Sequence, residues 1–213
     1  PQTVAVFTAP TPTTLTEIIV SQSEEVIKTI RKQERTERLR RIRKSTYTKH
    51  GLDKKFGVAL TMPSAYKIFK EDENTTWFQR EVQKGHINLL VTTTLYDTDI
   101  VAQQDLDKII AQHDSIGKAF VPGRLTNSHL ITEKAYKPYV YSTSFGNKPA
   151  LEIRGTWEVQ GDFMAGPFLQ YIINDKPNNR NVILEGFVFA PSAAKRDYIF
   201  EIETVLRSLQ ENR

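Results

Sequence analysis

The chain contains no cysteine among its 213 residues, and none of its apolar stretches is long. The first absence excludes disulfide bonds, cysteine nucleophiles and cysteine-ligated metal sites. The second excludes a membrane-spanning helix within this sequence, because such a helix needs about 18 or more apolar residues in a row. The hydrophobic content of 39% and the charged content of 25% are typical of a globular protein.

Sequence motifs of the common catalytic sites are also missing. The four histidines (50, 86, 113 and 129) lack the spacing of a metal site. Two Ser-x-x-Lys stretches occur, at 115–118 and 192–195, but the other elements of a β-lactamase-type site are absent. Ser192 is placed to cap a helix instead. We therefore predict no catalytic residue, no metal and no cofactor.

Positive charge is concentrated in one segment. Residues 28–44 hold nine basic and two acidic residues, a net +7, so the rest of a chain of net charge +4 carries −3. This pattern favours a solvated helix face, with contact to an anionic partner (nucleic acid or lipid headgroups) as the alternative. The segment has no aromatic residues for base stacking, so nucleic-acid binding is not expected.

Hydrophobic periodicity predicts three helices and two sets of strands. Residues 3–8 resemble a strand. Thr14 and Glu17 have the spacing of a capping box, which predicts the start of a long helix that ends near Gly51. Further helices are predicted over about 103–119 and from Pro191 onward. Strands are predicted at 56–61, 65–69, 76–82, 86–96, 129–132, 139–145, 150–159, 168–174 and 181–189.

This order, with runs of strands separated by single helices, predicts an α+β fold with a mainly antiparallel sheet flanked by helices. A long N-terminal helix and a C-terminal helix belong to that prediction. The division expected is residues 1–50, a strand and the basic helix, followed by an α+β domain over 51–213.

Polar and aromatic side chains are concentrated around a glycine-punctuated turn at 151–168. If two neighbouring strands carried Glu152, Arg154 and Glu185, alternate residues would share a face. One interpretation is a polar pocket or partner surface anchored by Trp157 and Met164. The other is a salt-bridged sheet with a tight turn and a buried Trp157. The residues that we predict to form a binding site are Arg154, Trp157, Asp162, Met164, Glu185, Lys195 and Arg196.

Several motifs together resemble a family of uncharacterised Bacteroidota cell-envelope lipoproteins, domain of unknown function 4837. They are Phe56-Gly57-Val58 with Pro63 and Tyr66, Trp77 with Arg80-Glu81, Arg154-Gly155-Thr156-Trp157, Gly161 to Phe168, Glu185 to Pro191, and Lys195 to Tyr198. Ala165 stands where this family leads us to expect glycine. His113-Asp114-Ser115 stands where we expect Arg-Asp-Ser, which removes a fixed charge. A weaker, fold-level similarity is to the PsbP/Mog1-like domains.

The resemblance implies an export signal and a lipidated cysteine upstream, and hence a periplasmic or outer-membrane lipoprotein. It implies no known activity. The leading hypothesis is a non-catalytic binding or scaffolding module whose partner is an envelope protein or a glycan. The alternatives are a hydrolase that uses the carboxylates of Glu152, Asp162 and Glu185, and a module that binds anions through the basic helix.

Overall fold

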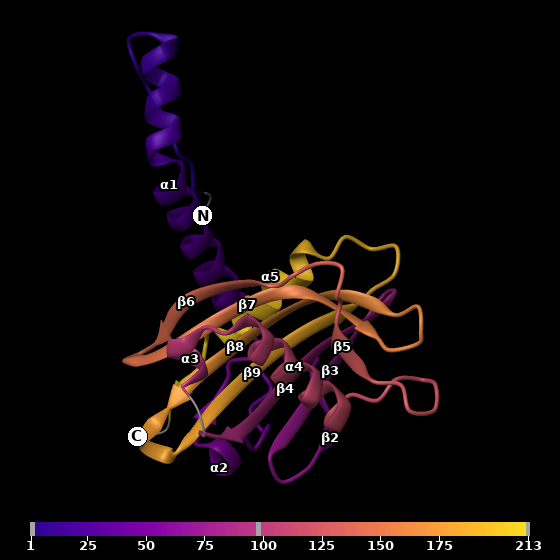
Figure 1. Ribbon diagram of the computed structural model, residues 1–213. Helices are drawn as coiled ribbons and strands as arrows, with labels where there is room; N and C mark the ends of the chain where they lie inside the picture. Colours follow the sequence, from indigo (N-terminus) through magenta and orange to yellow (C-terminus); the bar gives the residue numbers. More distant parts are fainter. Residues whose placement is uncertain (1–2, 97–98, 212–213) are drawn as a thin grey trace.

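The computed structural model describes residues 3–96 and 99–211. A long N-terminal helix, α1 (Pro12–Ile42), projects from a body in which helices cover a curled sheet (Figure 1). The predicted fold class, α+β with an antiparallel sheet and helices at both ends of the chain, is confirmed.

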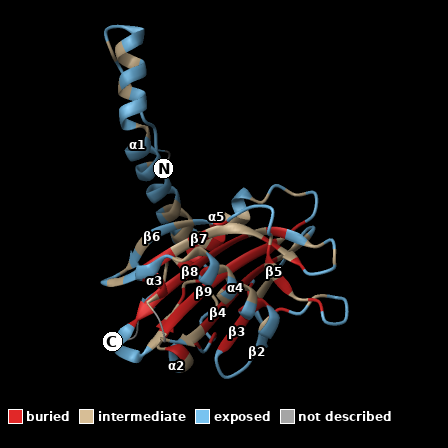
Figure 2. Ribbon diagram, viewed as in Figure 1, coloured by how far each residue is buried: buried red, intermediate tan, exposed pale blue. Residues whose placement is uncertain are grey.

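α1 begins one turn earlier than the capping-box spacing predicts. Thr11 is the N-cap, its hydroxyl accepts a hydrogen bond from the Thr14 backbone N–H at 3.2 Å, and Pro12 occupies the first helical position. Ile42 is its only buried residue, so most of the helix is in solvent (Figure 2). The predicted strand at 3–8 is wrong: residues 3–9 form no β pairing. The predicted helix end near Gly51 is also too late.

All pairings of the main sheet are antiparallel, in the order β2-β3-β4-β9-β8-β7-β5, with β6 also paired to β7. The strands are β2 (Lys67–Glu71), β3 (Thr75–Val82), β4 (Gly85–Leu95), β5 (Leu130–Thr132), β6 (Tyr139–Phe145), β7 (Lys148–Val159), β8 (Ala165–Asp175) and β9 (Arg180–Phe189). A separate pair joins β1 (Val58–Ala59) to β10 (Gln210–Glu211). The predicted strand at 56–61 was too long, since α2 (Leu52–Phe56) takes its first residue.

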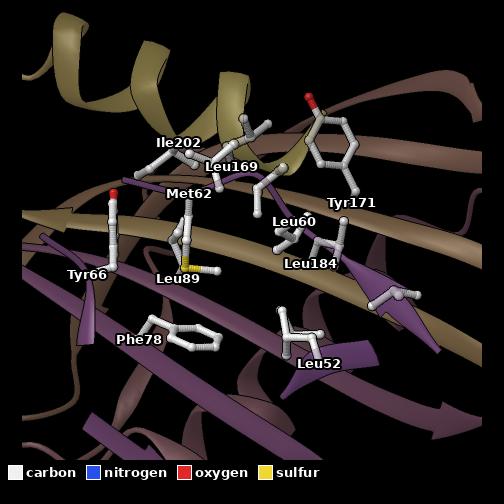
Figure 3. Close-up of a cluster of buried hydrophobic side chains, with 14 of the residues drawn as sticks. Leu52, Leu60, Met62, Tyr66, Phe78, Leu89, Leu169, Tyr171, Leu184 and Ile202 are labelled. Carbon is white, nitrogen blue, oxygen red and sulfur yellow. The ribbon is translucent and has the colours of Figure 1, made fainter. Parts of the chain in front are cut away.

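The first face of the sheet carries α5 (Arg196–Leu206) and α2. Its core includes Tyr66, Phe78, Leu89, Tyr171 and Ile202 (Figure 3). α5 packs directly against β9 at Gly186, where an added Cβ would lie 2.2 Å from Ile202 Cγ2. α5 begins at Arg196 and not at Pro191. Ser192 therefore caps no helix and instead has a φ of 60°, which belongs to a turn.

The second face carries α3 (Ile100–Gln103) and α4 (Leu106–Phe120). Sequence periodicity predicted one helix here, but Gln104, with a φ of 51°, separates the two. Asp105 caps α4 by accepting from the backbone N–H groups of Asp107 and Lys108. The core beneath them contains both tryptophans, Trp77 and Trp157. One sheet thus separates two hydrophobic cores. Its central strands β4, β8 and β9 are buried along most of their length (Figure 2).

Candidate functional site

Arg154 and Glu185 lie on opposite faces of the sheet, so the prediction that they share one face is wrong. β8 lies between their two strands. Across the three strands Arg154 aligns with Leu169 and Gly186, whereas Glu185 aligns with Gln170 and Ile153. Aligned residues point to the same side.

On the second face, Glu185 is buried under α4 with His113. His113 Nε2 lies 3.2 Å from Glu185 Oε1, and Gln170 Nε2 donates to Glu185 Oε2 at 3.1 Å. His113 Nδ1 lies 2.8 Å from Thr132 Oγ1, and its ring stacks on Phe168 at 4.3 Å. Both side chains of the His–Glu pair are 2% exposed.

His113 is a cation at neutral pH in this setting. Burial alone would lower the pKa of His113, but the carboxylates of Glu185 and Asp114 outweigh that penalty and raise it to about 9. Both ring nitrogens then carry protons and donate to Glu185 and Thr132. The pair is closed off from solvent, so Glu185 is a structural carboxylate here.

On the first face, Arg154 belongs to an ion-pair chain between the sheet and the helices. Its guanidinium donates to Glu152 and to Glu203 of α5, each at 2.7 Å. Arg207 donates to the other Glu152 oxygen at 2.7 Å, and Tyr171 Oη donates to the same oxygen at 2.9 Å. Burial opposes the charge of Arg154, but Glu203 and Glu152 raise its pKa above the usual value.

Ion pairs with α5 also anchor the last turns of α1. Arg35 reaches Glu203 at 3.1 Å, and Arg38 reaches Glu201 at 2.8 Å. Farther along the basic segment, Arg40 and Arg41 both bind Glu37 of their own helix. With Lys28, which lies 3.6 Å from Glu25, five of the nine basic residues of 28–44 are paired with carboxylates within the protein.

Asp162 and Met164 lie at the β7–β8 turn, away from Arg154 and Glu185. Gly161 has a φ of 78°, the left-handed conformation that glycine adopts easily. Asp162 forms a two-point ion pair with Arg124, at 2.9 and 2.7 Å, and this hydrogen bonding lowers the pKa of Asp162. The pair fixes the turn against the loop that follows α4.

Between this turn, that loop and the sheet lies a pocket of about 210 Å³. We call it the aromatic pocket; its aromatic walls are Trp77, Trp157, Phe187, Phe189 and His86. Met164 and Arg124 also line it. The indole N–H of Trp157 is buried, with no hydrogen-bond partner among the described residues. The structure thus brings two of the predicted residues, Trp157 and Met164, to one pocket.

Phe163 is the residue that sequence reasoning missed. It is fully exposed (105%), although it directly precedes Met164 of the pocket wall. Other large apolar side chains are exposed as well, Val20 and Leu95 among them, but none of them as fully as Phe163. The sequence signal was available, since an aromatic residue in a Gly-Asp turn serves no need of the turn itself.

Lys195 and Arg196 lie at the start of α5, apart from the aromatic pocket. Lys195 donates to the Ala193 carbonyl at 3.0 Å. Arg196 is exposed and lies 3.8 Å from Glu34 of α1 and 3.4 Å from Asp197. Across residues 3–96 and 99–211 no group of three or more potential ligands could hold a metal ion. No helix in the same ranges is long and apolar enough to span a membrane.

The sequence profile of one family matches residues 45–208, which is most of the chain. The chain belongs to the family Domain of unknown function (DUF4837). The predicted family is thereby confirmed. The match starts after α1 and includes the whole main sheet, the aromatic pocket and α5. No curated protein matches the chain.

Three solved structures are similar to the DUF4837 chain at low sequence identity. The Ran-binding protein Mog1p of Saccharomyces cerevisiae has 8% identity and a TM-score of 0.46, over 73% of this chain and 90% of that one. A Mog1 point mutant has 6% identity and a TM-score of 0.42, over the same shares. A protein of unknown function from Pseudomonas aeruginosa has 13% identity and a TM-score of 0.33, over 62% and 76%.

Proposed function

We propose that this DUF4837 domain is a non-catalytic binding module of the cell envelope, and that it captures an apolar side chain of a partner protein in the aromatic pocket. The observation that carries the proposal is the pocket itself: its walls are aromatic, and the buried indole N–H of Trp157 has no hydrogen-bond partner among the described residues. Pockets lined by aromatic side chains, tryptophan above all, are typical of binding hot spots. The volume of about 210 Å³ suits a single aromatic or aliphatic side chain.

The arrangement of carboxylates argues against the hydrolase alternative. Glu152 is bound by Arg154 and Arg207, Asp162 by Arg124, and Glu185 by His113. Two of these carboxylates lie on opposite faces of the sheet and the third at a turn. A pair that divides acid and base roles has to converge on one substrate, which this geometry does not allow.

The two tryptophans give a direct test, because the chain has only Trp77 and Trp157 and both line the aromatic pocket. We expect N-acetyl-phenylalaninamide to change the tryptophan fluorescence saturably, with a Kd on the order of 1 mM, typical of a fragment that forms one contact. N-acetylglucosamine should produce no saturable change.

Two variants test whether the fluorescence change arises from binding in the aromatic pocket or at the surface beside it. Met164→Asp places a charge on the pocket wall and should abolish the fluorescence change. Phe163→Ser removes an exposed ring that does not line the pocket, and should leave it unchanged. Binding of the sugar in place of the amide would assign the pocket to glycans and contradict the proposal. Turnover of an ester or glycoside, lost in Glu185→Gln, would also contradict it.

A further inference from the structure

The two long edges of the main sheet differ in how they are protected. β2, at one edge, has only five residues, two lysines and a bulge between Ile68 and Lys70. These are the devices by which proteins prevent an edge strand from pairing with another chain. β6, beside β7 at the other edge, has seven residues, no charge, no proline and an unbroken register with β7 (Figure 1).

The outward backbone groups of Val140 and Ser142 in β6 form no hydrogen bond within the described part of the chain, so they can pair with another strand. Phe145 and Lys148 close a two-residue turn, so Phe145, Thr143, Tyr141 and Tyr139 turn their backbone groups toward β7. The alternate residues Val140, Ser142 and Ser144 face outward. In agreement with this, the Ser144 carbonyl accepts from the Arg207 side chain at 3.3 Å.

The side chains of β6 and of the loop before it form an exposed surface rich in tyrosine. None of its residues is buried. Tyr139 and Tyr141 are 69% and 51% exposed, and their rings stack at 6.5 Å with an angle of 14°. Tyr136, in the preceding loop, is 69% exposed. Tyrosine is enriched at interfaces because it supplies a large contact area at little entropic cost.

The charged residues near β6 indicate what kind of strand could pair with this edge. The exposed Lys134 and Lys137 lie just before β6, and residues 139–148 contain no carboxylate. In an antiparallel arrangement with a second copy, these lysines would meet the end of the partner β6, where Lys148 is paired with the buried Asp175. A second copy therefore brings no unpaired acidic group to them. A segment that ends in Asp or Glu would supply the opposite charge.

We propose that β6 is a docking edge for an extended segment of another protein, which adds antiparallel to the sheet and carries acidic residues at its C-terminal end. Main-chain hydrogen bonds to Val140 and Ser142 supply the affinity, and the tyrosine pair contacts alternate side chains of the segment. This edge is separate from the aromatic pocket, which is lined by other strands of the sheet.

The test is selection of a phage-displayed library of random twelve-residue peptides on the whole chain. We expect enrichment of peptides in which β-branched or aromatic residues alternate with others and are followed by Asp or Glu. For a synthetic version, amide exchange at Val140 and Ser142 should slow at least tenfold on binding. Ser142→Pro should weaken binding at least tenfold, because it removes an outward N–H that no intramolecular strand uses.

Matched variants control for side-chain and charge effects. Ser142→Ala keeps the backbone edge and loses only the hydroxyl bound by Gln104, so it should bind the peptide unchanged. The pair Lys134→Gln and Lys137→Gln should weaken binding severalfold and flatten its salt dependence. The exchange measurement uses the unaltered chain, so the test stands even if Ser142→Pro does not fold.

Three results would overturn the proposal. The first is a selection that enriches no such peptide. The second is a peptide that binds without slowing exchange at Val140 and Ser142, or whose binding is lost in Met164→Asp. The third is a concentration-dependent dimer of the chain that Ser142→Pro abolishes, which would assign the edge to a second copy.

Discussion

At the scale of single residues, the most consequential contact is the buried pair of His113 and Glu185. The family resemblance led us to expect arginine at position 113, and the structure gives the reason. Glu185 is 2% exposed and needs a cation beside it, which His113 supplies when protonated. The buried carboxylate of Glu185 is thus balanced by a titratable cation and not by a permanent one.

The stability of the fold should therefore depend on pH. The folded-state pKa of His113, about 9, lies above its ordinary value of 6.5. Its stabilising contribution is fully present below pH 6.5 and is lost as the pH rises through 9. The loss amounts to on the order of 3 kcal/mol, and urea denaturation between pH 6 and 10 measures it.

His113→Gln is the matched variant. It leaves Glu185 buried without a cation, so the free energy of unfolding at pH 6.5 should fall by about 3–5 kcal/mol. The decline between pH 6.5 and 9 should disappear in this variant. If the variant and the unaltered chain lost stability equally over that range, the titration would belong to another group.

Gly186 is a second residue whose role is set by one contact. Gly186→Ala would place a Cβ 2.2 Å from Ile202 Cγ2 and force α5 away from β9. We expect a loss of about 1–3 kcal/mol in chemical denaturation. Ile202→Ala in the same chain opens the space, so the double variant should be more stable than the sum of the two single losses predicts.

At the scale of elements, α1 has two unlike halves. Its last turns are held by Arg35, Arg38 and the buried Ile42, whereas Ile19, Val20 and Ile27 are exposed on the projecting part. Isolated helices gain little stability in water without tertiary packing. The two halves should therefore differ in stability although they form one continuous helix.

Hydrogen exchange on the whole chain should reveal this difference. We expect backbone amides over residues 16–30 to exchange at least tenfold faster than those over 38–42. Arg38→Ala, which breaks the contact with Glu201, should increase exchange in the last turns and leave residues 16–30 unchanged. Equal protection along the helix would mean that its projecting half is packed against another surface.

The helices and strands also show which features the sequence could predict and which it could not. The strand at 139–145 was predicted to the residue, because alternation and turn residues are local signals. The prediction that Arg154 and Glu185 share one face was wrong, because faces depend on strand order and β8 lies between their strands. Trp157 and Met164 were brought together correctly, since one turn connects them. Phe163 was passed over although an aromatic residue in a Gly-Asp turn is a local signal; only the extent of its exposure depends on tertiary packing.

At the scale of the whole molecule, one sheet serves as a common wall of two cores. Leu184 belongs to the first core, and both tryptophans belong to the second. The two cores share the backbone of β4, β8 and β9 and should unfold as one unit. Neither side of the sheet can lose its packing without affecting the other.

Leu184→Ala tests this coupling. We expect a loss of about 2–5 kcal/mol, because the change leaves a cavity in the first core. The unfolding midpoint seen by tryptophan fluorescence, which reports the second core, should shift as far as the midpoint seen by far-ultraviolet circular dichroism. Separate midpoints for the two signals would mean that the faces unfold independently.

The pairing of β4 with β9 also leaves β4 without its neighbour for part of the time that the chain is being synthesised. β4 ends at residue 95 and β9 begins at residue 180, so the β2–β3–β4 meander is made long before its neighbour. Until β9 emerges, Ile87, Leu89, Leu90 and Val91 lie on an open strand edge that can pair with other nascent chains. The nascent chain is therefore most prone to aggregation while residues 96–179 are being made.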